Sequence, residues 1–365
     1  MVGAFPPPVH GMASINAAMF ERLKQCGIEP LKLDLAPATL DRGWLNRIRR
    51  TKKVVKALRR FAGEMASGQG RTLYVGLSGG WGQIYESLFV VFAKLRGARI
   101  FLHHHSFAYL DQPSLPASVL INLAGRSATH VVLCEVQGRR LRERYAVVSD
   151  VRNVSNAAIM DRVAPVLNVR TRLRRVGFLG NISREKGIDD VISIAERLVS
   201  AGIGVDLQVA GPFENSSIEH DFRRALARFP LLKYSGPVYR SEKDAFFDSV
   251  DVMLFPSTYV NETAPLVVYE AMSHGIPVIA KRRGCLVEMI PEGSGVCVCP
   301  NEDYSARALE CLAGWQRDPA GLAQASRAAA AAFDQQVKKS AGNLGDLLRD
   351  LCNNTYPGLS PAPCQ

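Results

Sequence analysis

The side chains in this chain whose spacing most suggests chemistry are two carboxylates, Glu262 and Glu270, with seven residues between them. Apolar residues in 266–273 follow helical spacing, and Gly275 stands where a helix C-cap favours glycine. Glu262 is therefore expected in a loop and Glu270 inside the helix, where both carboxylates can face one cleft. Backbone amides at the start of the helix add an anion site. Those amides belong to Ala264, Leu266 and Val267.

Two apolar runs flank these carboxylates and indicate strands. Residues 251–255 have strand length and end at Pro256-Ser257. Residues 276–280 are short, apolar and rich in β-branched side chains, as expected of a strand buried on both faces. The predicted order is strand, loop, helix, strand. The alternative interpretation is that Glu262 is an ordinary loop charge and that Glu270 lies on a solvated helix face.

The stretch FPSTYVNETAPLVVYEAMSHGIPVIA, residues 255–280, resembles the E-x7-E region of the retaining nucleotide-sugar glycosyltransferases of family GT4. These enzymes have the GT-B fold. The resemblance implies an α/β protein with two Rossmann-like, doubly wound parallel-sheet domains facing a central cleft. It also implies that Glu270 binds the ribose hydroxyls and that Glu262 lies near the hydroxyls of the sugar. Strands and helices alternate along both halves of the chain, which independently favours two parallel sheets.

A second loop, residues 180–187, resembles the donor loop of the same family. Lys186 matches the family lysine that meets the diphosphate. Asn181 stands where the family has an arginine, and Arg184, three residues later, is a candidate substitute. The leaving nucleoside diphosphate gains negative charge, which fixed cations and amides can stabilise without a metal. The alternative for Lys186 is a solvated lysine before a helix.

A strand is predicted at 232–235. The same resemblance implies that the segment after it forms the site for the nucleobase. In the family the backbone at this point brackets the nucleobase. Val238 and Tyr239 are the candidates here.

The first half begins with a strand at 2–5, a loop at 6–11 and a helix at 12–25, the layout of a phosphate-facing turn. In the family this loop carries two glycines near the diphosphate and the acceptor. Here Gly11 is present and Met12 replaces the other glycine. An ordinary strand–helix loop is the alternative.

Three consecutive histidines, His103, His104 and His105, follow a predicted strand at 99–103. Alternate strand residues face opposite ways, so only His103 and His105 are expected to converge. A metal site is one hypothesis, although this spacing suits it poorly. The family resemblance instead implies that His105 hydrogen-bonds the donor sugar.

Residues 42–60 contain nine Lys or Arg and no acidic residue. Trp44, Ile48, Val55, Leu58 and Phe61 fall roughly on one helical face. A basic amphipathic helix can lie among the headgroups of an anionic bilayer. The cations expected to bind lipid or acceptor are Arg49, Arg50, Lys52 and Lys53. A helix packed on its own domain is the alternative, and a nucleic-acid patch is a weaker one.

Length and composition indicate the number of domains, the charge of the partners and the compartment. The 365 residues favour two domains, and the net charge of +11 favours anionic partners. Eight scattered cysteines without a CxxC pair suggest a reducing cytoplasm. Cys297 and Cys299 share one face of a predicted strand, where small core residues are favoured over a metal pair. No signal peptide and no apolar run of transmembrane length is visible.

The predicted organisation is an acceptor domain at 1–165, a nucleotide-sugar donor domain at 166–333, and a C-terminal helix and tail at 334–365 that can return to the first domain. The predicted reaction moves a sugar from a UDP- or GDP-sugar to an acceptor hydroxyl with retention, in glycolipid, lipid-linked oligosaccharide or polysaccharide synthesis. No cofactor, metal or nucleic acid is expected. The alternatives are a nucleotide-sugar epimerase of the same fold and a non-catalytic binding protein.

Overall fold

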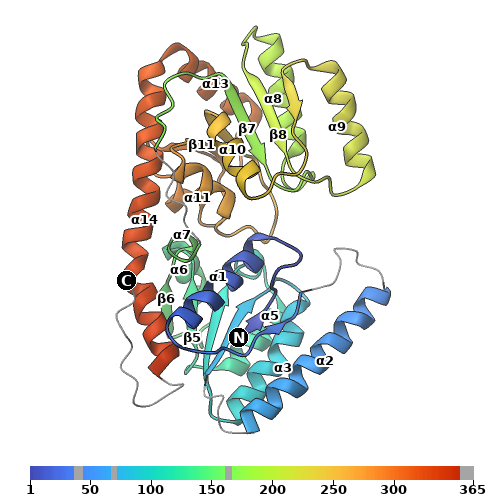
Figure 1. Cartoon of the computed structure of the whole chain (residues 1–365), viewed down its shortest axis with the longest axis vertical. Coiled ribbons are helices and arrows are strands. Elements are labelled where there is room, and N and C mark those ends of the chain that lie inside the picture. Colours follow the sequence, from blue (N-terminus) through green and yellow to red (C-terminus); the bar gives the residue numbers. More distant parts are fainter. Residues whose placement is uncertain (37–43, 67–71, 161–166, 354–365) are drawn as a thin grey trace. The chain divides into compact units, whose positions relative to one another are not determined.

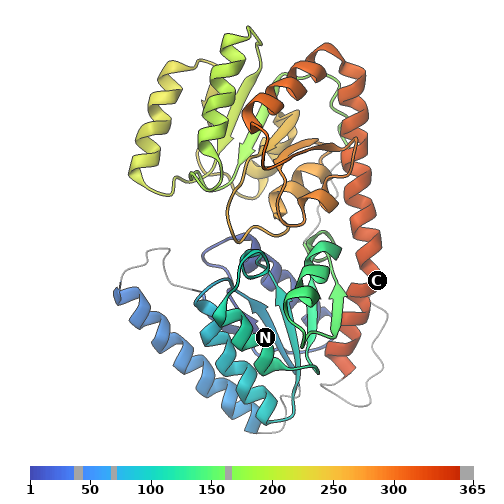
Figure 2. The same cartoon turned by 180° about the vertical axis from the view of Figure 1, so that it is seen from behind.

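The structure, a computed structural model, describes residues 1–36, 44–66, 72–160 and 167–353, without the side chains of 44–50 and 353. Two compact units divide the chain. The first unit holds Met1–Asp161 and the chain from Val337 onwards, and the second unit holds Arg162–Gln336. Figures 1 and 2 show their elements from opposite sides. The predicted domain boundary at 165–166 lies outside the described residues.

The first unit contains a six-stranded parallel sheet in the order β2-β1-β3-β4-β5-β6. Its central strands are buried almost throughout, which is typical of a parallel sheet covered on both faces. The strands are β1 Val2–Gly3, β2 Leu33–Asp34, β3 Thr72–Leu77, β4 Arg99–His104, β5 Thr129–Val132 and β6 Asp150–Asn153. The helices are α1 Gly11–Gln25, α2 Trp44–Ala66, α3 Gly82–Leu95, α4 Ala108–Asp111, α5 Leu115–Ala124, α6 Glu135–Arg144 and α7 Asn156–Ile159.

The second unit contains another six-stranded parallel sheet, in the order β12-β11-β10-β7-β8-β9. Its strands are β7 Arg175–Leu179, β8 Asp206–Ala210, β9 Leu232–Tyr234, β10 Val252–Phe255, β11 Val278–Lys281 and β12 Gly295–Val298. Its helices are α8 Ile188–Ser200, α9 Ser216–Arg228, α10 Ser241–Ser249, α11 Leu266–Ser273, α12 Leu286–Met289, α13 Tyr304–Arg317 and the start of α14, Pro319–Asn353.

Neighbouring residues of β7 show why this second sheet is covered on both faces. A Cβ on Gly177 would lie 3.1 Å from the ring of Phe246 in α10, so the missing side chain lets α10 approach the strand. Phe178 points the other way and joins the core with Ile194 of α8 and Phe222 of α9. The doubly wound α/β class predicted from the alternation of elements is therefore confirmed.

Both sheets reverse their winding direction at one internal position. In the second unit the reversal lies between β7 and β10, and in the first unit it lies between β1 and β3. In open α/β sheets, ligands bind beyond the carboxyl ends of the strands at this reversal. A ligand site is therefore expected in the loops that follow β7 and β10. These loops contain Lys186 and Glu262.

The strand predicted at 2–5 is shorter in the structure, where β1 is Val2–Gly3. The strand β2 is also short, and Pro30, which precedes it, cannot donate to a strand ladder. A short helix, α7, follows β6. The last two helices almost meet, since Asp318 alone separates α13 from α14.

One side of the basic helix α2 packs within the first unit, and of the predicted apolar stripe it includes Phe61. Val54, Phe61 and Met65 are buried, and Phe61 packs against Phe89 and Phe92 of α3. Val55 is 43% exposed, so the prediction that it shares a face with Phe61 is wrong. Residues six apart on a helix point about 120° apart. The side chains of Trp44, Ile48, Arg49 and Arg50 lie outside the described residues.

Candidate active site

The strongest polar cluster joins the loops after β7 and β10. Lys186 Nζ lies 2.5 Å from Glu262 Oε2, and Ser257 Oγ donates to the same oxygen at 2.8 Å. The carboxylate of Glu262 is largely buried, whereas the Lys186 side chain is partly exposed. The two residues are 76 positions apart, and the direct pairing of β7 with β10 brings them together. A buried carboxylate held by a cation and a hydroxyl is fixed in orientation.

The backbones of these two loops are also joined. The amide N–H of Thr258 donates to the Glu185 carbonyl at 2.8 Å. Gly187 has φ +86°, a conformation that favours glycine, and a side chain here would run into Pro256. Gly187 thus lets the lysine loop lie directly against the glutamate loop.

Tyr259 is a site residue that the sequence analysis missed. The Lys186 ammonium lies 4.7 Å from the centroid of its ring, and Asn261 Nδ2 donates to its hydroxyl at 3.1 Å. A cation near an aromatic ring is stabilised by the quadrupole of the ring. Lys186 is therefore held between a ring and a carboxylate. The position of Tyr259 beside the PS pair of the loop was the available signal.

The loop after β11 supports the Glu262 loop from outside. Arg283 Nη2 donates to the Val260 carbonyl, and the Cys285 amide donates to the Thr263 carbonyl, both at 2.8 Å. Gly284 between them has φ +51°, and a Cβ there would meet the backbone of Glu262 and Thr263. The glutamate is thus positioned by backbone contacts on both sides of its loop.

Glu270 has a cationic partner of its own. Lys243 Nζ of α10 lies 2.5 Å from Glu270 Oε1. The second oxygen, Oε2, is buried and has no hydrogen-bond partner among the described residues. A buried carboxylate oxygen without a donor is costly, so this oxygen is suited to a hydroxyl ligand. Lys243 was not anticipated, because nothing in the spacing of α10 marks it.

The helix that carries Glu270 begins at Leu266, with Pro265 at the N-cap. No side chain caps this end. Ala264, Leu266 and Val267 lie together at the start of α11, as predicted for an anion-binding helix terminus.

Asn181, at the position of the family arginine, and its candidate substitute Arg184 both lie on the surface. Asn181 is exposed in the loop after β7. The Arg184 guanidinium bonds Asp189 at 2.9 Å and Asp221 at 2.9 Å. Exposed ion pairs of this kind are weak, so the Arg184 side chain could exchange them for a ligand. The role of Arg184 at the diphosphate stays a prediction.

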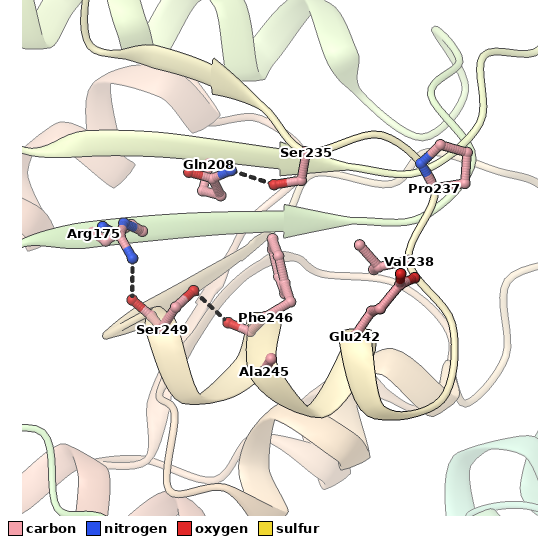
Figure 3. A pocket seen from close by; sticks show the side chains of 9 residues that line it. All are labelled: Arg175, Gln208, Ser235, Pro237, Val238, Glu242, Ala245, Phe246 and Ser249. Carbon is pink, nitrogen blue, oxygen red and sulfur yellow. Dashed lines mark hydrogen bonds between the residues drawn. The ribbon is translucent and has the colours of Figure 1, made fainter.

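Val238 and Tyr239 lie in the loop between β9 and α10. Val238 lines one end of a pocket of about 490 Å³ between α10 and the sheet, where it approaches Glu242 (Figure 3). Arg175 lines the far end and donates to the Ser249 carbonyl at 3.2 Å. None of the residues that line this pocket is Lys186, Glu262 or Glu270, so the pocket is separate from the carboxylates.

In the first unit, His105 follows β4 and packs against His103, with ring centroids 4.0 Å apart. Burial, and then the charge of His10, lowers the pKa of His105 to about 3, so the ring is neutral at pH 7. Its Nε2 is buried without a hydrogen-bond partner among the described residues. His105 can therefore exchange a hydrogen bond with a ligand but cannot supply a charge.

The other histidines have partners within the first unit. His103 Nδ1 lies 2.6 Å from the Tyr74 hydroxyl. His104 faces the opposite side, where its ring nitrogens lie 2.9 Å from His130 Nδ1 and 2.8 Å from the Tyr109 hydroxyl. Among the described residues, no group of three or more His, Cys, Asp or Glu is placed to hold a metal ion.

Gly11 is the first residue of α1, and His10 is its N-cap. His10 Nδ1 accepts the Ala13 amide N–H at 3.4 Å, and burial lowers the pKa of His10. Asn16 of α1 was not predicted. Its Nδ2 donates to the Ala4 carbonyl at 2.9 Å, and its side chain fills the space beside Gly76. A polar residue on the buried face of α1 was the signal.

Comparison with family models finds a match within the second unit. Residues 174–314 match the family model described as glycosyl transferases group 1. The match includes Lys186, Glu262 and Glu270 and ends before α14.

Curated relatives match parts of the chain. They include the sulfoquinovosyl transferase SQD2 of Arabidopsis thaliana, which is 32% identical over 114 residues, 31% of this chain and 20% of the relative. A D-inositol 3-phosphate glycosyltransferase of Corynebacterium urealyticum is 26% identical over 203 residues, 54% of this chain and 47% of the relative. The chain thus spans less than half the length of these curated relatives.

Solved structures resemble the whole fold. HepE of Anabaena, crystallised with UDP, has a TM-score of 0.70 and 16% identity, covering 96% of this chain and 99% of its own. The sucrose-phosphate synthase of Thermosynechococcus elongatus has a TM-score of 0.70 and 17% identity, covering 96% and 98%. At these identities the likeness shows the fold alone, which is the GT-B fold.

Within the matched region, the arrangement separates two chemical tasks. Lys186 and the start of α11 offer positive charge to an anion. Glu262 accepts a hydrogen bond from the Ser257 hydroxyl, and the open oxygen of Glu270 can accept one from a hydroxyl of a ligand. A ligand with both a diphosphate and several hydroxyls would satisfy all four groups.

Proposed function

We propose that this protein is a GT4-type glycosyltransferase that moves a sugar from a nucleotide-diphosphate sugar to an acceptor hydroxyl with retention of configuration. The observation that carries the proposal is the meeting of Lys186, Ser257 and Glu262 at the reversal of a group 1 sheet, with Glu270 on the helix that follows. The curated relatives, with names that include sulfoquinovosyl transferase and glycogen synthase, support sugar transfer as the reaction class.

In the proposed mechanism the bond between the anomeric carbon and the diphosphate oxygen breaks, and the acceptor oxygen bonds the same face of that carbon. The acceptor proton passes to the departing diphosphate oxygen. No nucleophilic side chain is required. Lys186 and the amides of α11 stabilise the charge that grows on the diphosphate. His105, neutral because of its lowered pKa, hydrogen-bonds the sugar and does not remove a proton.

Within the donor, Glu270 takes the ribose hydroxyls through Oε2, while Lys243 holds Oε1. Glu262 contacts the sugar hydroxyls. Backbone groups near Val238 and Tyr239 bracket the base. A uracil base is the first choice, because the structural neighbour HepE was crystallised with UDP and with UDP-glucose. A GDP-sugar is the second.

For the acceptor we propose a lipid-linked or growing glycan at the cytoplasmic face of the cell membrane. The support is the charge of α2, whose described cations Lys52, Lys56, Arg59 and Arg60 are exposed. Lys53 is less available, since its ammonium bonds Asp34 at 2.6 Å. No helix within the described residues is both long and apolar enough to span a bilayer.

The test is a donor screen with purified protein. UDP-glucose, UDP-N-acetylglucosamine and GDP-mannose are each supplied, and release of UDP or GDP is followed with and without lipid-linked acceptors. Titration calorimetry with free UDP and GDP measures the nucleotide preference in parallel. Turnover of one donor, lost in Lys186→Ala, is the expected result. Epimerised donor without acceptor would favour the epimerase, and nucleotide binding without any turnover would favour a non-catalytic protein.

A further inference from the structure

An apolar ridge runs along the outside of α3. Trp81, at its N-cap, is 79% exposed and Leu95, at its last position, is 78% exposed. Ile84 and Leu88 are exposed between them. Spacings of three, four and seven residues place all four side chains on one face of a helix. A helix of a soluble domain ordinarily turns such a face inward, so this ridge indicates a contact surface.

The neighbouring helices extend the ridge into a surface. Leu115 and Val119 of α5 and Val55 of α2 are also exposed. The three helices are in contact: Thr51 of α2 bonds Tyr85 of α3 at 3.2 Å, and Lys94 of α3 donates to the Leu123 carbonyl of α5 at 2.8 Å. Figures 1 and 2 both show α2 and α3 side by side.

Of the thirteen large apolar side chains that are exposed in the described part of the chain, seven lie on this surface. We call it the α3 face. It consists of Val55, Trp81, Ile84, Leu88, Leu95, Leu115 and Val119.

The surroundings of the α3 face are strongly basic. Residues 44–99 contain twelve Lys or Arg but two acidic residues, Glu64 and Glu86. Glu86 is buried. Lys52, Lys56, Arg59 and Arg60 of α2, together with Lys94 and Arg96 at the end of α3, are exposed. Apolar side chains bordered by cations match an anionic bilayer, where the apolar groups enter the interface and the cations meet the headgroups.

We propose that the α3 face inserts into the interfacial layer of an anionic membrane, with α2 lying in the headgroups beside it. This inference rests on the proposed membrane attachment and changes the element that inserts. The buried side of α2 cannot insert, because Val54, Phe61 and Met65 are already packed in the first unit. Trp81 at one end of the ridge suits the polar–apolar boundary, where tryptophan is enriched.

The experiment measures co-sedimentation of the full chain with vesicles of phosphatidylglycerol and phosphatidylcholine, and with phosphatidylcholine alone. The test variant combines Leu88→Glu with Leu95→Glu. Its matched control is Val199→Glu on α8, since Val199 is an exposed apolar residue on a helix of the second unit. A charge variant combines Lys52→Glu with Lys56→Glu. Circular dichroism and UDP affinity verify that every variant is folded and that the group 1 domain is intact.

Wild type and Val199→Glu are expected to bind anionic vesicles equally, and Leu88→Glu/Leu95→Glu at least about tenfold more weakly. The charge variant should bind anionic vesicles about fivefold more weakly for each cation replaced. Added salt should weaken vesicle binding by the wild type in the same way. A fluorescence blue shift on binding that is lost in Trp81→Phe places the ridge in lipid.

Three outcomes would overturn the inference. Equal binding of the double variant and the wild type would leave attachment to the charges of α2 alone. A wild type that ignores anionic vesicles would remove the membrane proposal while leaving donor turnover unaffected. Self-association that Leu88→Glu/Leu95→Glu abolishes, without vesicle binding, would assign the α3 face to a second copy of this chain.

Discussion

The two units share one architecture and place opposite kinds of polar group at the carboxyl ends of their strands. In the second unit these ends carry ion pairs, Lys186 with Glu262 and, from the adjoining helices, Lys243 with Glu270. In the first unit the end of β4 carries buried neutral histidines, His103, His104 and His105. A parallel sheet presents its strand ends for binding in either case. The side chains there decide whether the site receives charge or only hydrogen bonds.

This difference explains why the sequence of the second unit specifies its site more fully than the sequence of the first unit does. A diphosphate requires cations and helix amides, and these leave a compact signature in one loop and one helix. Neutral hydroxyls can be bound by many kinds of polar residue at many positions in a chain. The family match accordingly covers residues 174–314 and none of the first unit.

The sharpest test of the charged site is Lys186→Ala. Loss of a charge-assisted contact of this kind costs about 1.5–3 kcal/mol, so UDP affinity and donor turnover should fall by one to two orders of magnitude. Arg184→Ala is the matched control, since its exposed ion pairs contribute about 0–1 kcal/mol. If both variants lose UDP affinity equally, Arg184 occupies the place of the family arginine. If neither does, Lys186 does not meet the diphosphate.

Acidification should weaken the first unit through its buried histidines. Burial lowers the pKa of His130 to about 4, so the folded state binds fewer protons than the unfolded state below pH 6.5. The resulting stability is complete above pH 6.5 and declines as the pH falls from there toward 4. At pH 5 the loss from His130 alone is about 2 kcal/mol. Urea unfolding at pH 7 and pH 5, with hydrogen exchange to resolve the units, measures it.

His130→Asn provides the control for this pH effect. The variant should show a smaller difference between pH 7 and pH 5 than the wild type. Equal acid sensitivity of the two units, or an unchanged difference in His130→Asn, would remove the neutral histidines from the contrast between the halves.

The two glutamates should divide their work within the second unit. Glu270→Gln should weaken the binding of free UDP by about 1–2 kcal/mol, because a charged acceptor for the ribose hydroxyls becomes neutral. Lys243→Met should act in the same direction, since the ammonium positions Glu270. Glu262→Gln should spare free UDP and lower turnover of the sugar donor. Calorimetry with UDP and steady-state kinetics separate these effects, and equal losses of UDP affinity would contradict the division.

Backbone strain offers a smaller test of the same unit. Arg240 is the single non-glycine residue with positive φ, +49°, in the described part of the chain, and it directly follows Val238 and Tyr239. Arg240→Gly should raise the free energy of unfolding by about 1 kcal/mol. A thermal melt measures the stability. Unchanged or lower stability would mean that the surroundings favour this conformation.

The smallest expected effect is that of a chelator. Cations and amides supply the positive charge in the proposed donor site, so EDTA should leave donor turnover unchanged. Activity that is lost on chelation and restored by Mn²⁺ or Mg²⁺ would contradict this prediction. That outcome would favour the hypothesis of a metal site at His103 and His105.

Local sequence was sufficient for the α/β class and for the loop and helix that carry Glu262 and Glu270. Helical spacing in 266–273, glycine at 275 and short β-branched runs act over a few neighbouring residues, so they can be interpreted without the rest of the chain. The same holds for the strand that ends at the three histidines. Short edge strands such as β2 escape this approach, because their extent depends on the neighbour with which they pair.

Tertiary structure alone decided which residues meet. The partner of Glu262 lies 76 positions away and that of Glu270 lies 27 positions away, and no local pattern specifies either pairing. Strand order determines the first pairing, since β7 and β10 become neighbours although β8 and β9 separate them along the chain. Packing likewise selected the face of α2 that is buried and left the ridge of α3 exposed. A helix pattern shows that an apolar face exists, but only the neighbouring elements determine whether that face is covered.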